Sequence, residues 1–364
     1  MKNKLVFVAG TLGLPRIIKR IRSFYDAGYD IIVYAFDRST FQNINLLPPE
    51  IEVIRLGEME DQHNYIKNFF RNQVELIKVF KKYRNEDVIY YAFSFVPASA
   101  VWLFSRKKYI YEISDLLYTN FSNCIIRDII TRVDKKIIRN ALLTVFTSQG
   151  FIDYLFPRKS PPRVFLHPNK LNSYFKDLER NCNKIEGVSL RFAFVGYLRY
   201  PNTIFRFAKI IGEYFPQHQF LFYGDSTYRN MAIELSETYS NIQYYGKFKN
   251  PEELPQIYKN IDINVACYDT STQNERIAEP NKLYESLFFS KPLVVSENTF
   301  LASRVKEFGC GYVINPFDNQ SIIDFVKSLK VADLNEIIYK EYQLNTSSLL
   351  DNPLDLMNKI NTLK

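Results

Sequence analysis

The chain contains the segment Glu275-Arg276-Ile277-Ala278-Glu279-Pro280-Asn281-Lys282-Leu283-Tyr284-Glu285, which runs on into Ser286-Leu287-Phe288-Phe289-Ser290-Lys291-Pro292-Leu293-Val294-Val295-Ser296. Pro280 predicts the first turn of a helix, where no backbone N–H is needed. Leu283, Leu287 and Phe288 then recur at helical spacing, and Lys291-Pro292 predicts the end of the helix. The segment is therefore expected to be a loop that leads into a helix, followed by a short buried strand.

This predicted helix N-terminus has the chemistry of an anion site. Free backbone N–H groups and the helix dipole favour negative charge there. Lys282 lies in the first turn and can add a point charge for a phosphate. Glu285 lies one turn further in, where a carboxylate could accept two hydrogen bonds from a ribose diol. Together these groups would hold a nucleoside diphosphate, although both side chains could equally be ordinary solvated helix residues.

Composition indicates a globular protein with more than one domain. The 364 residues are 46% hydrophobic and 24% charged, and they are enough for two or three domains. No apolar run is long enough for a transmembrane helix, and the apolar run near Met1 is too short for a signal peptide. The four cysteines and three histidines show no metal-ligand spacing. We therefore expect a reduced, cytoplasmic protein without a metal site.

Charge is distributed unevenly along the chain. The net charge is +8, but residues 1–185 carry 29 Lys and Arg against 18 Asp and Glu, whereas the remainder carries 18 against 21. A basic half suggests an anionic partner. No nucleic-acid-binding motif is visible, so no nucleic acid is expected. Among anionic partners, peripheral contact with an anionic membrane is therefore favoured. Nucleic-acid binding stays a minor alternative, because the pI is near 9.0.

The first half reads as an α/β domain with a parallel sheet. Residues 4–9 and 31–36 are apolar strands joined by an amphipathic helix, which makes a βαβ unit with a crevice at its strand ends. The turn before this helix contains Gly10 and Gly13, but the dinucleotide fingerprint is incomplete. The predicted strand 109–113 is followed by Asp115, at the edge where such sheets bind ligands. Asp115 is therefore a candidate acceptor contact, or else the N-cap of a following helix.

A second βα series begins after a polar, unpatterned stretch at about 171–188. The predicted strand 190–195 ends in Gly196, and Arg199 follows within the same loop. A guanidinium fork suits a diphosphate, so Arg199 is a candidate phosphate contact. A later predicted strand, over 242–245, is followed by Gly246 and Lys247. The domain boundary is expected within the polar stretch.

These motifs resemble those of GT-B glycosyltransferases, especially the retaining GT4-like group, also called glycosyl transferases group 1. The likeness is strongest over 190–315, where the Pro-Asn-Lys-Leu core of the donor motif lies. It implies an α/β GT-B fold of two Rossmann-like parallel-sheet domains facing each other across a cleft. The expected divisions are an acceptor-binding domain at 1–175, a nucleotide-sugar donor domain at 176–345, and a C-terminal helix at 346–364 that packs back on the first domain.

The resemblance also implies an activity and a set of site residues. The expected protein is a retaining glycosyltransferase that moves a sugar from a UDP- or GDP-type donor to a glycan or lipid-linked acceptor, in bacterial cell-surface polysaccharide synthesis at the inner face of the membrane. No cofactor is expected, because protein cations would stabilise the leaving diphosphate. The expected catalytic residues are Asp115, Arg199, Lys282 and Glu279. The expected donor-binding residues are Gly10, Gly13, Gly196, Arg199, Lys247, Asn281, Lys282, Leu283 and Glu285.

One position departs from the family pattern. Many GT4 members carry a first Glu eight positions before the second, and here that position is Ile277. Glu275 or Glu279 could substitute from a neighbouring position, or this branch could work without the residue. Two rival functions also remain open at the level of sequence: a sugar-nucleotide epimerase or hydrolase on the same fold, and a non-catalytic module that binds a glycan or a partner.

Overall fold

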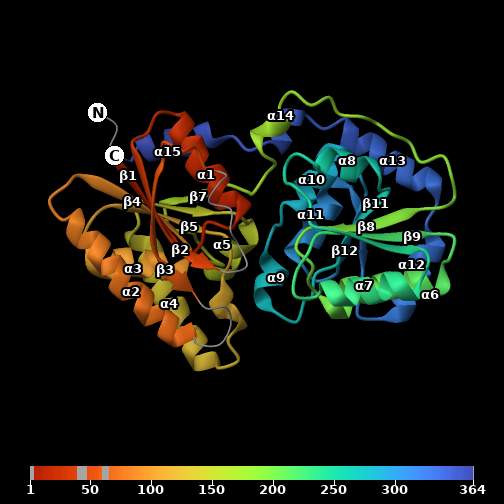
Figure 1. Ribbon diagram of the computed structural model, residues 1–364, viewed down its shortest axis with the longest axis horizontal. Coiled ribbons are helices and arrows are strands. Elements are labelled where there is room, and N and C mark those ends of the chain that lie inside the picture. Colours follow the sequence, from red (N-terminus) through yellow and green to blue (C-terminus); the bar gives the residue numbers. More distant parts are fainter. Residues whose placement is uncertain (1–3, 39–46, 60–64, 364) are drawn as a thin grey trace. The chain divides into compact units, whose positions relative to one another are not determined.

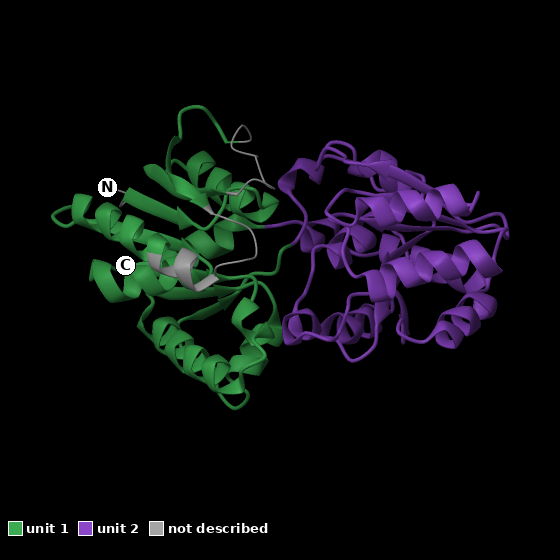
Figure 2. Cartoon of the chain, turned by 60° about the horizontal axis from the view of Figure 1, so that its bottom comes forward, with its two compact units in different colours: residues 1–169, 352–364 green, residues 170–351 purple. Residues whose placement is uncertain are grey.

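The computed structural model describes residues 4–38, 47–59 and 65–363 (Figure 1). The chain divides into two compact units (Figure 2). Unit 1 comprises Met1–Asn169 and Asn352–Lys364, and unit 2 comprises Lys170–Asp351. The divisions therefore lie a few residues from the expected ones, after 169 where 175 was expected and after 351 where 345 was expected.

Unit 1 is built on a parallel sheet of seven strands within the described residues. The strand order is β3-β2-β1-β4-β5-β6-β7. The strands are β1 (Lys4–Ala9), β2 (Ile31–Arg38), β3 (Glu52–Met59), β4 (Val88–Phe93), β5 (Tyr109–Ile113), β6 (Leu143–Phe146) and β7 (Val164–Leu166). β1, β4, β5 and β6 are almost entirely buried, as expected for parallel strands covered on both faces.

Helices connect these strands in the βα manner. They are α1 (Pro15–Asp26), α2 (Tyr65–Lys82), α3 (Phe95–Ala100), α4 (Cys124–Asn140) and α5 (Gln149–Leu155), with a π-helical turn η2 (Val101–Ser105) and a 3₁₀ turn η3 (Leu117–Asn120). The C-terminal helix α15 (Pro353–Asn361) belongs to this unit: Leu356 and Ile360 share one hydrophobic core with Ile17 and Ile21 of α1.

Unit 2 repeats the architecture with a six-stranded parallel sheet, ordered β10-β9-β8-β11-β12-β13. Its strands are β8 (Arg191–Val195), β9 (Gln219–Tyr223), β10 (Ile242–Gly246), β11 (Ile263–Ala266), β12 (Leu293–Ser296) and β13 (Gly311–Ile314). Its helices are α6 (Arg206–Tyr214), α7 (Arg229–Thr238), α8 (Leu254–Lys259), α9 (Gln273–Ile277), α10 (Lys282–Phe289), α11 (Phe300–Phe308), α12 (Asn319–Ser328), α13 (Val331–Tyr342) and α14 (Thr346–Leu349), with a 3₁₀ turn η4 (Ser173–Phe175) and a π-helical turn η5 (Pro201–Phe205).

The two sheets confirm the prediction of two Rossmann-like parallel-sheet units. In each of them the strand order reverses beside the first strand, between β1 and β4 and between β8 and β11. Open α/β sheets bind ligands at the carboxyl ends of the strands at such a switch point. A ligand site is therefore expected at these two edges.

Candidate functional site

The predicted helix exists, but it begins at Lys282, so Pro280 lies just before the helix and not in its first turn. Asn281 is the N-cap residue of α10, directly after Pro280. Lys282 Nζ lies 2.6 Å from Glu285 Oε2, one turn along the helix, and Asn281 Nδ2 donates to Glu285 Oε1 over 2.7 Å. Glu285 is only 2% exposed, so this ion pair is largely removed from water. Asn281, Lys282 and Glu285 thus form one connected cluster.

A second layer holds Glu285 from the neighbouring helix and strand. The hydroxyl of Tyr258, on α8, donates to Glu285 Oε2 over 2.8 Å. Asn264, on β11, donates to both Tyr258 and Ser286. Both oxygens of Glu285 are therefore already engaged by the chain's own donors, and the ribose role expected for this residue stays a prediction. Sequence reasoning missed Tyr258 and Asn264, which belong to no motif.

Leu283 does not line the site. It is fully buried in the core beneath α10, together with Leu287 and Phe288. Its side chain anchors α10 on the sheet, as the helical spacing predicted. The donor contact that the resemblance implied for Leu283 stays a prediction.

Glycines end three adjacent strands at the carboxyl edge. Gly196, Gly224 and Gly246 follow or end β8, β9 and β10 with φ of 141°, 136° and 76°. A Cβ on Gly224 would lie 1.7 Å from the carbonyl oxygen of Gly196, so the two loops touch backbone to backbone. A Cβ on Gly196 would lie 3.2 Å from Cε of Lys282. The Lys282 side chain therefore reaches the Gly196 loop, and the structure brings these two predicted residues together.

Arg199 lies on the same loop as Gly196 and is exposed. Its guanidinium lies over the ring of Tyr197, 4.9 Å from the centroid. The loop then turns through Tyr200, whose φ is 67° and whose ring contacts that of Tyr268 at 4.9 Å. Burial raises the pKa of Tyr268 well above its usual value; nearby Tyr200 and Glu285 raise it further, whereas Arg199 lowers it. Arg199 and Glu285 therefore both act on Tyr268, a residue that the motifs did not point to.

Lys247 follows β10 at the same edge of the sheet. Its ammonium is 3.9 Å from Asp225 Oδ2, and its side chain is largely exposed. Asp225 is held in place by the hydroxyl of Tyr244. Lys247 is thus an exposed cation just after β10, which lies two strands away from β8.

Glu275 and Glu279 are the two acids that could replace the first Glu of the family pattern, and they lie in different surroundings. Glu279 is buried, accepts a hydrogen bond from Tyr284, and pairs with Arg304 of α11 over 3.1 Å. Burial raises its pKa. Glu275, on α9, lies close enough to Tyr268 to raise the pKa of that phenol. Glu275 is therefore the acid that shares surroundings with Arg199 and Glu285, and Glu279 fastens the loop to α11.

Candidates in unit 1 lie at the carboxyl edge of its sheet. Gly10 follows β1 and has open space where a Cβ would point. Gly13 donates its N–H to Thr11. Asp115 is exposed and accepts a hydrogen bond from Ser114. It is not a helix N-cap, because the turn that follows begins at Leu117 and is preceded by Leu116.

Behind Asp115 lies a buried ionic cluster that the sequence did not predict. Glu112 is fully buried, its Oε2 accepts from Arg20 Nε over 3.0 Å, and its Oε1 lies 3.3 Å from Arg16 Nε. Arg20 also contacts His167 Nε2 at 3.1 Å. The cluster ties α1 to β5 and to the end of β7. His167 is therefore a structural residue here.

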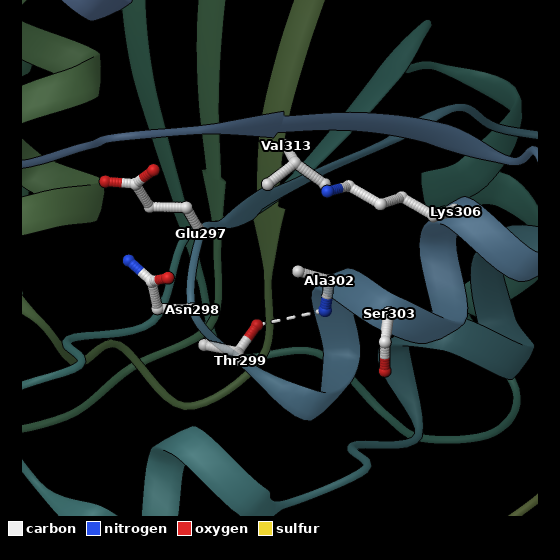
Figure 3. A pocket seen from close by; sticks show the side chains of 7 residues that line it. All are labelled: Glu297, Asn298, Thr299, Ala302, Ser303, Lys306 and Val313. Carbon is white, nitrogen blue, oxygen red and sulfur yellow. Dashed lines mark hydrogen bonds between the residues drawn. The ribbon is translucent and has the colours of Figure 1, made fainter.

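A shallow pocket of about 470 Å³ lies apart from these residues, at the start of α11 (Figure 3). The Thr299 hydroxyl caps that helix by accepting from the N–H of Ala302. The lining residues are Glu297, Asn298, Thr299, Ala302, Ser303, Lys306 and Val313. None of the predicted site residues is among them.

Two negative findings concern the described part of the chain only. No group of three or more His, Cys, Asp or Glu side chains is placed to hold a metal ion. No helix there has the length and apolar character needed to cross a bilayer.

Comparison with known proteins identifies the fold. No family model and no curated protein sequence matches the chain. Sucrose-phosphate synthase from Thermosynechococcus elongatus is similar in structure, with a TM-score of 0.72, 14% identity, and coverage of 100% of this chain and 98% of that one. HepE from Anabaena, in complex with UDP-glucose, has a TM-score of 0.69 at 14% identity, covering 99% and 98%. The lipopolysaccharide outer core galactosyltransferase WaaB has a TM-score of 0.60 at 14% identity, covering 99% of each chain.

These similarities extend over the whole chain and over almost the whole of each related structure. Together with the two parallel sheets, they show that the chain has the GT-B fold of nucleotide-sugar glycosyltransferases. At this level of identity the similarity defines the fold, and the activity has to be argued from the residues at the site.

Proposed function

We propose that the protein is a glycosyltransferase that uses a nucleoside-diphosphate sugar as donor. The observation that carries this proposal is the position of Lys282. Its side chain starts at the N-terminus of α10 and reaches the glycine turn after β8, beside the point where the strand order of unit 2 reverses. Backbone N–H groups and an ammonium converge there, as a diphosphate requires.

In this proposal Lys282 and Arg199 act on the departing diphosphate. Negative charge grows on the leaving group as the bond to the sugar breaks, and fixed cations that match it lower the barrier. Arg199 is exposed and free to fold over a bound nucleotide, whereas Lys282 is held by Glu285. Glu285, Asn281 and Lys247 would contact the nucleoside, and the proposal assigns Glu275 the place of the missing acid at Ile277.

The proposal extends to a retaining outcome, a UDP- or GDP-type donor without a cofactor, and a cytoplasmic enzyme of cell-surface polysaccharide synthesis. HepE, solved with UDP-glucose, supports the donor class, and WaaB, named a lipopolysaccharide outer core galactosyltransferase, supports the pathway. Asp115, Gly10 and Gly13 are proposed to contact the acceptor or donor from unit 1. The acceptor would be a glycan or a lipid-linked intermediate.

Donor-dependent release of nucleoside diphosphate tests the activity. The protein is incubated with common UDP- and GDP-sugars, with and without a lipid extract as acceptor, and the anomeric form of the product is read by NMR. Arg199→Ala is expected to slow release at least about tenfold through the loss of a charged contact in the transition state. The exposed Lys209, on α6, provides the matched control Lys209→Ala.

Four outcomes would contradict the proposal. An altered sugar nucleotide without transfer would indicate an epimerase, and release that needs no acceptor would indicate a hydrolase. Binding of a glycan without any turnover would indicate a non-catalytic module. Equal rates for Arg199→Ala and Lys209→Ala would reject the assigned site.

A further inference from the structure

The outward face of α4 exposes large apolar side chains. Ile125, Ile126 and Ile129 are 67%, 47% and 52% exposed, although isoleucine is among the residues most often buried. All three lie in the first two turns of the helix, directly after the Asn123 cap. Leu117, in the 3₁₀ turn that packs on α4, is also 53% exposed. A cluster of this kind indicates a contact surface.

The same face carries cations further along the helix. Residues 125, 129, 132 and 136 follow one another at spacings of four and three, so they lie on one side of α4. Ile125 and Ile129 are therefore continued by Arg132 and Lys136, both exposed, and Arg139 follows one turn later. The outward face thus carries the exposed isoleucines, together with the exposed Asp128, in its first half and cations in its second.

The inward face of α4 is fixed, so the outward face cannot roll into the core. Asp134 is fully buried and accepts hydrogen bonds from Tyr111 over 3.0 Å and Tyr118 over 2.6 Å. Ile137 and Ile138 are buried beside it. Turning the helix to cover the exposed isoleucines would bury Arg132 and Lys136, at a high desolvation cost.

A neighbouring segment repeats this arrangement. Leu103 and Phe104, in the π-helical turn η2, are 53% and 46% exposed. After Ser105 come three cations, of which Arg106 and Lys108 are exposed and Lys107 is half-buried. The preceding helix α3 contacts α4, and Figure 1 shows α3 and α4 on the same side of the unit 1 sheet. Apolar side chains followed by cations therefore occur twice in this part of unit 1.

We propose that this face of unit 1, centred on α4, docks on an anionic lipid bilayer. The isoleucines would enter the boundary between headgroups and acyl chains, while Arg132, Lys136 and Arg139 would bind lipid phosphates. A second copy of this chain is a poorer occupant, because it would bring the same cations against one another. The inference rests on unit 1 alone and holds whether or not the protein transfers sugar.

Vesicle co-sedimentation tests this proposal. The full chain is mixed with vesicles of phosphatidylcholine, or of an equimolar mixture with phosphatidylglycerol, at low and high salt. Binding is expected only to the mixture, and it weakens as salt rises, because exposed charges are screened. Ile125→Gln with Ile129→Gln removes apolar insertion, and Arg132→Gln with Lys136→Gln removes charge. Each pair is expected to weaken partitioning at least about tenfold.

Matched controls use equally exposed residues elsewhere in unit 1. Leu354→Gln, on α15, and Arg158→Gln with Lys159→Gln, after α5, are expected to bind like the parent. Absence of binding to both kinds of vesicle would overturn the proposal, as would equal losses in the control variants. Sedimentation velocity tests whether a second copy of the chain binds this face instead. A dimer that dissociates in the variant with Ile125→Gln and Ile129→Gln would show a contact between copies, and would also overturn the proposal.

Discussion

Lys282 and Glu285 form a buried ion pair, with Nζ 2.6 Å from Oε2, at the first turn of α10. The sequence motif predicted both residues but not that they form a buried pair. Glu285 holds the ammonium at a fixed point beside Gly196, and Tyr258 and Asn281 hold Glu285. Because the Lys282 ammonium is already held in place, little reorganisation would be needed when negative charge develops beside it.

The first prediction concerns the stability of this pair. Glu285→Gln leaves Lys282 buried without its counter-charge, so we expect a loss of about 3 kcal/mol or more, with Lys282→Met similarly damaging. The double variant should recover part of the loss, because no unpaired charge remains. Chemical denaturation measures each value. The exposed pair Lys340–Glu336 is the control, and Glu336→Gln should leave stability close to that of the parent protein.

The second prediction concerns Gly224. Its φ of 136° and the 1.7 Å approach to the Gly196 carbonyl leave no room for a Cβ. Gly224→Ala is therefore expected to cost about 3 kcal/mol or more, or to prevent soluble expression. Gly10→Ala is the control, since nothing lies within 4 Å of a Cβ there. Similar melting temperatures for the two variants would show that the two glycine loops do not meet as described.

The third prediction concerns pH and Asp134. Burial raises the pKa of this carboxyl to about 6, and the hydroxyls of Tyr118 and Tyr111 only partly offset the effect. The folded protein therefore holds a proton that the unfolded chain releases at lower pH, near 4. Stability should fall as pH rises from about 4 to about 6 and then level off. In melting experiments, Asp134→Asn should lose this dependence of stability on pH. An unchanged dependence would contradict the buried position described for Asp134.

Sequence reasoning found the sheets because fully buried parallel strands read as short apolar runs bounded by glycine or proline. β8 and β12 are examples, with Gly196 after the first and Pro292 before the second. It found Lys282 and Glu285 for a related reason, since a helix N-terminus after a polar loop has a local signature. Both kinds of information lie within a few residues along the chain.

The remaining features depend on residues far apart in sequence. Tyr258 and Glu285 meet across 27 positions, and Arg20 and Glu112 across 92. No local pattern encodes such contacts, so the enclosure of Glu285 and the ionic cluster of unit 1 could not be predicted. Leu283 belongs to the local kind: its helical spacing predicted a buried position, and the side chain lies in the core. The exposed isoleucines of α4 also look like core residues until their surroundings are known.

Calorimetric titration of UDP and GDP into the intact protein tests the proposed nucleotide site most directly. We predict that one of the two nucleotides binds the parent protein and binds Arg199→Ala at least about tenfold more weakly, while Lys209→Ala keeps the parent affinity. Failure of both nucleotides to bind the parent, or equal affinity for Arg199→Ala and Lys209→Ala, would contradict a diphosphate site at the carboxyl edge of unit 2.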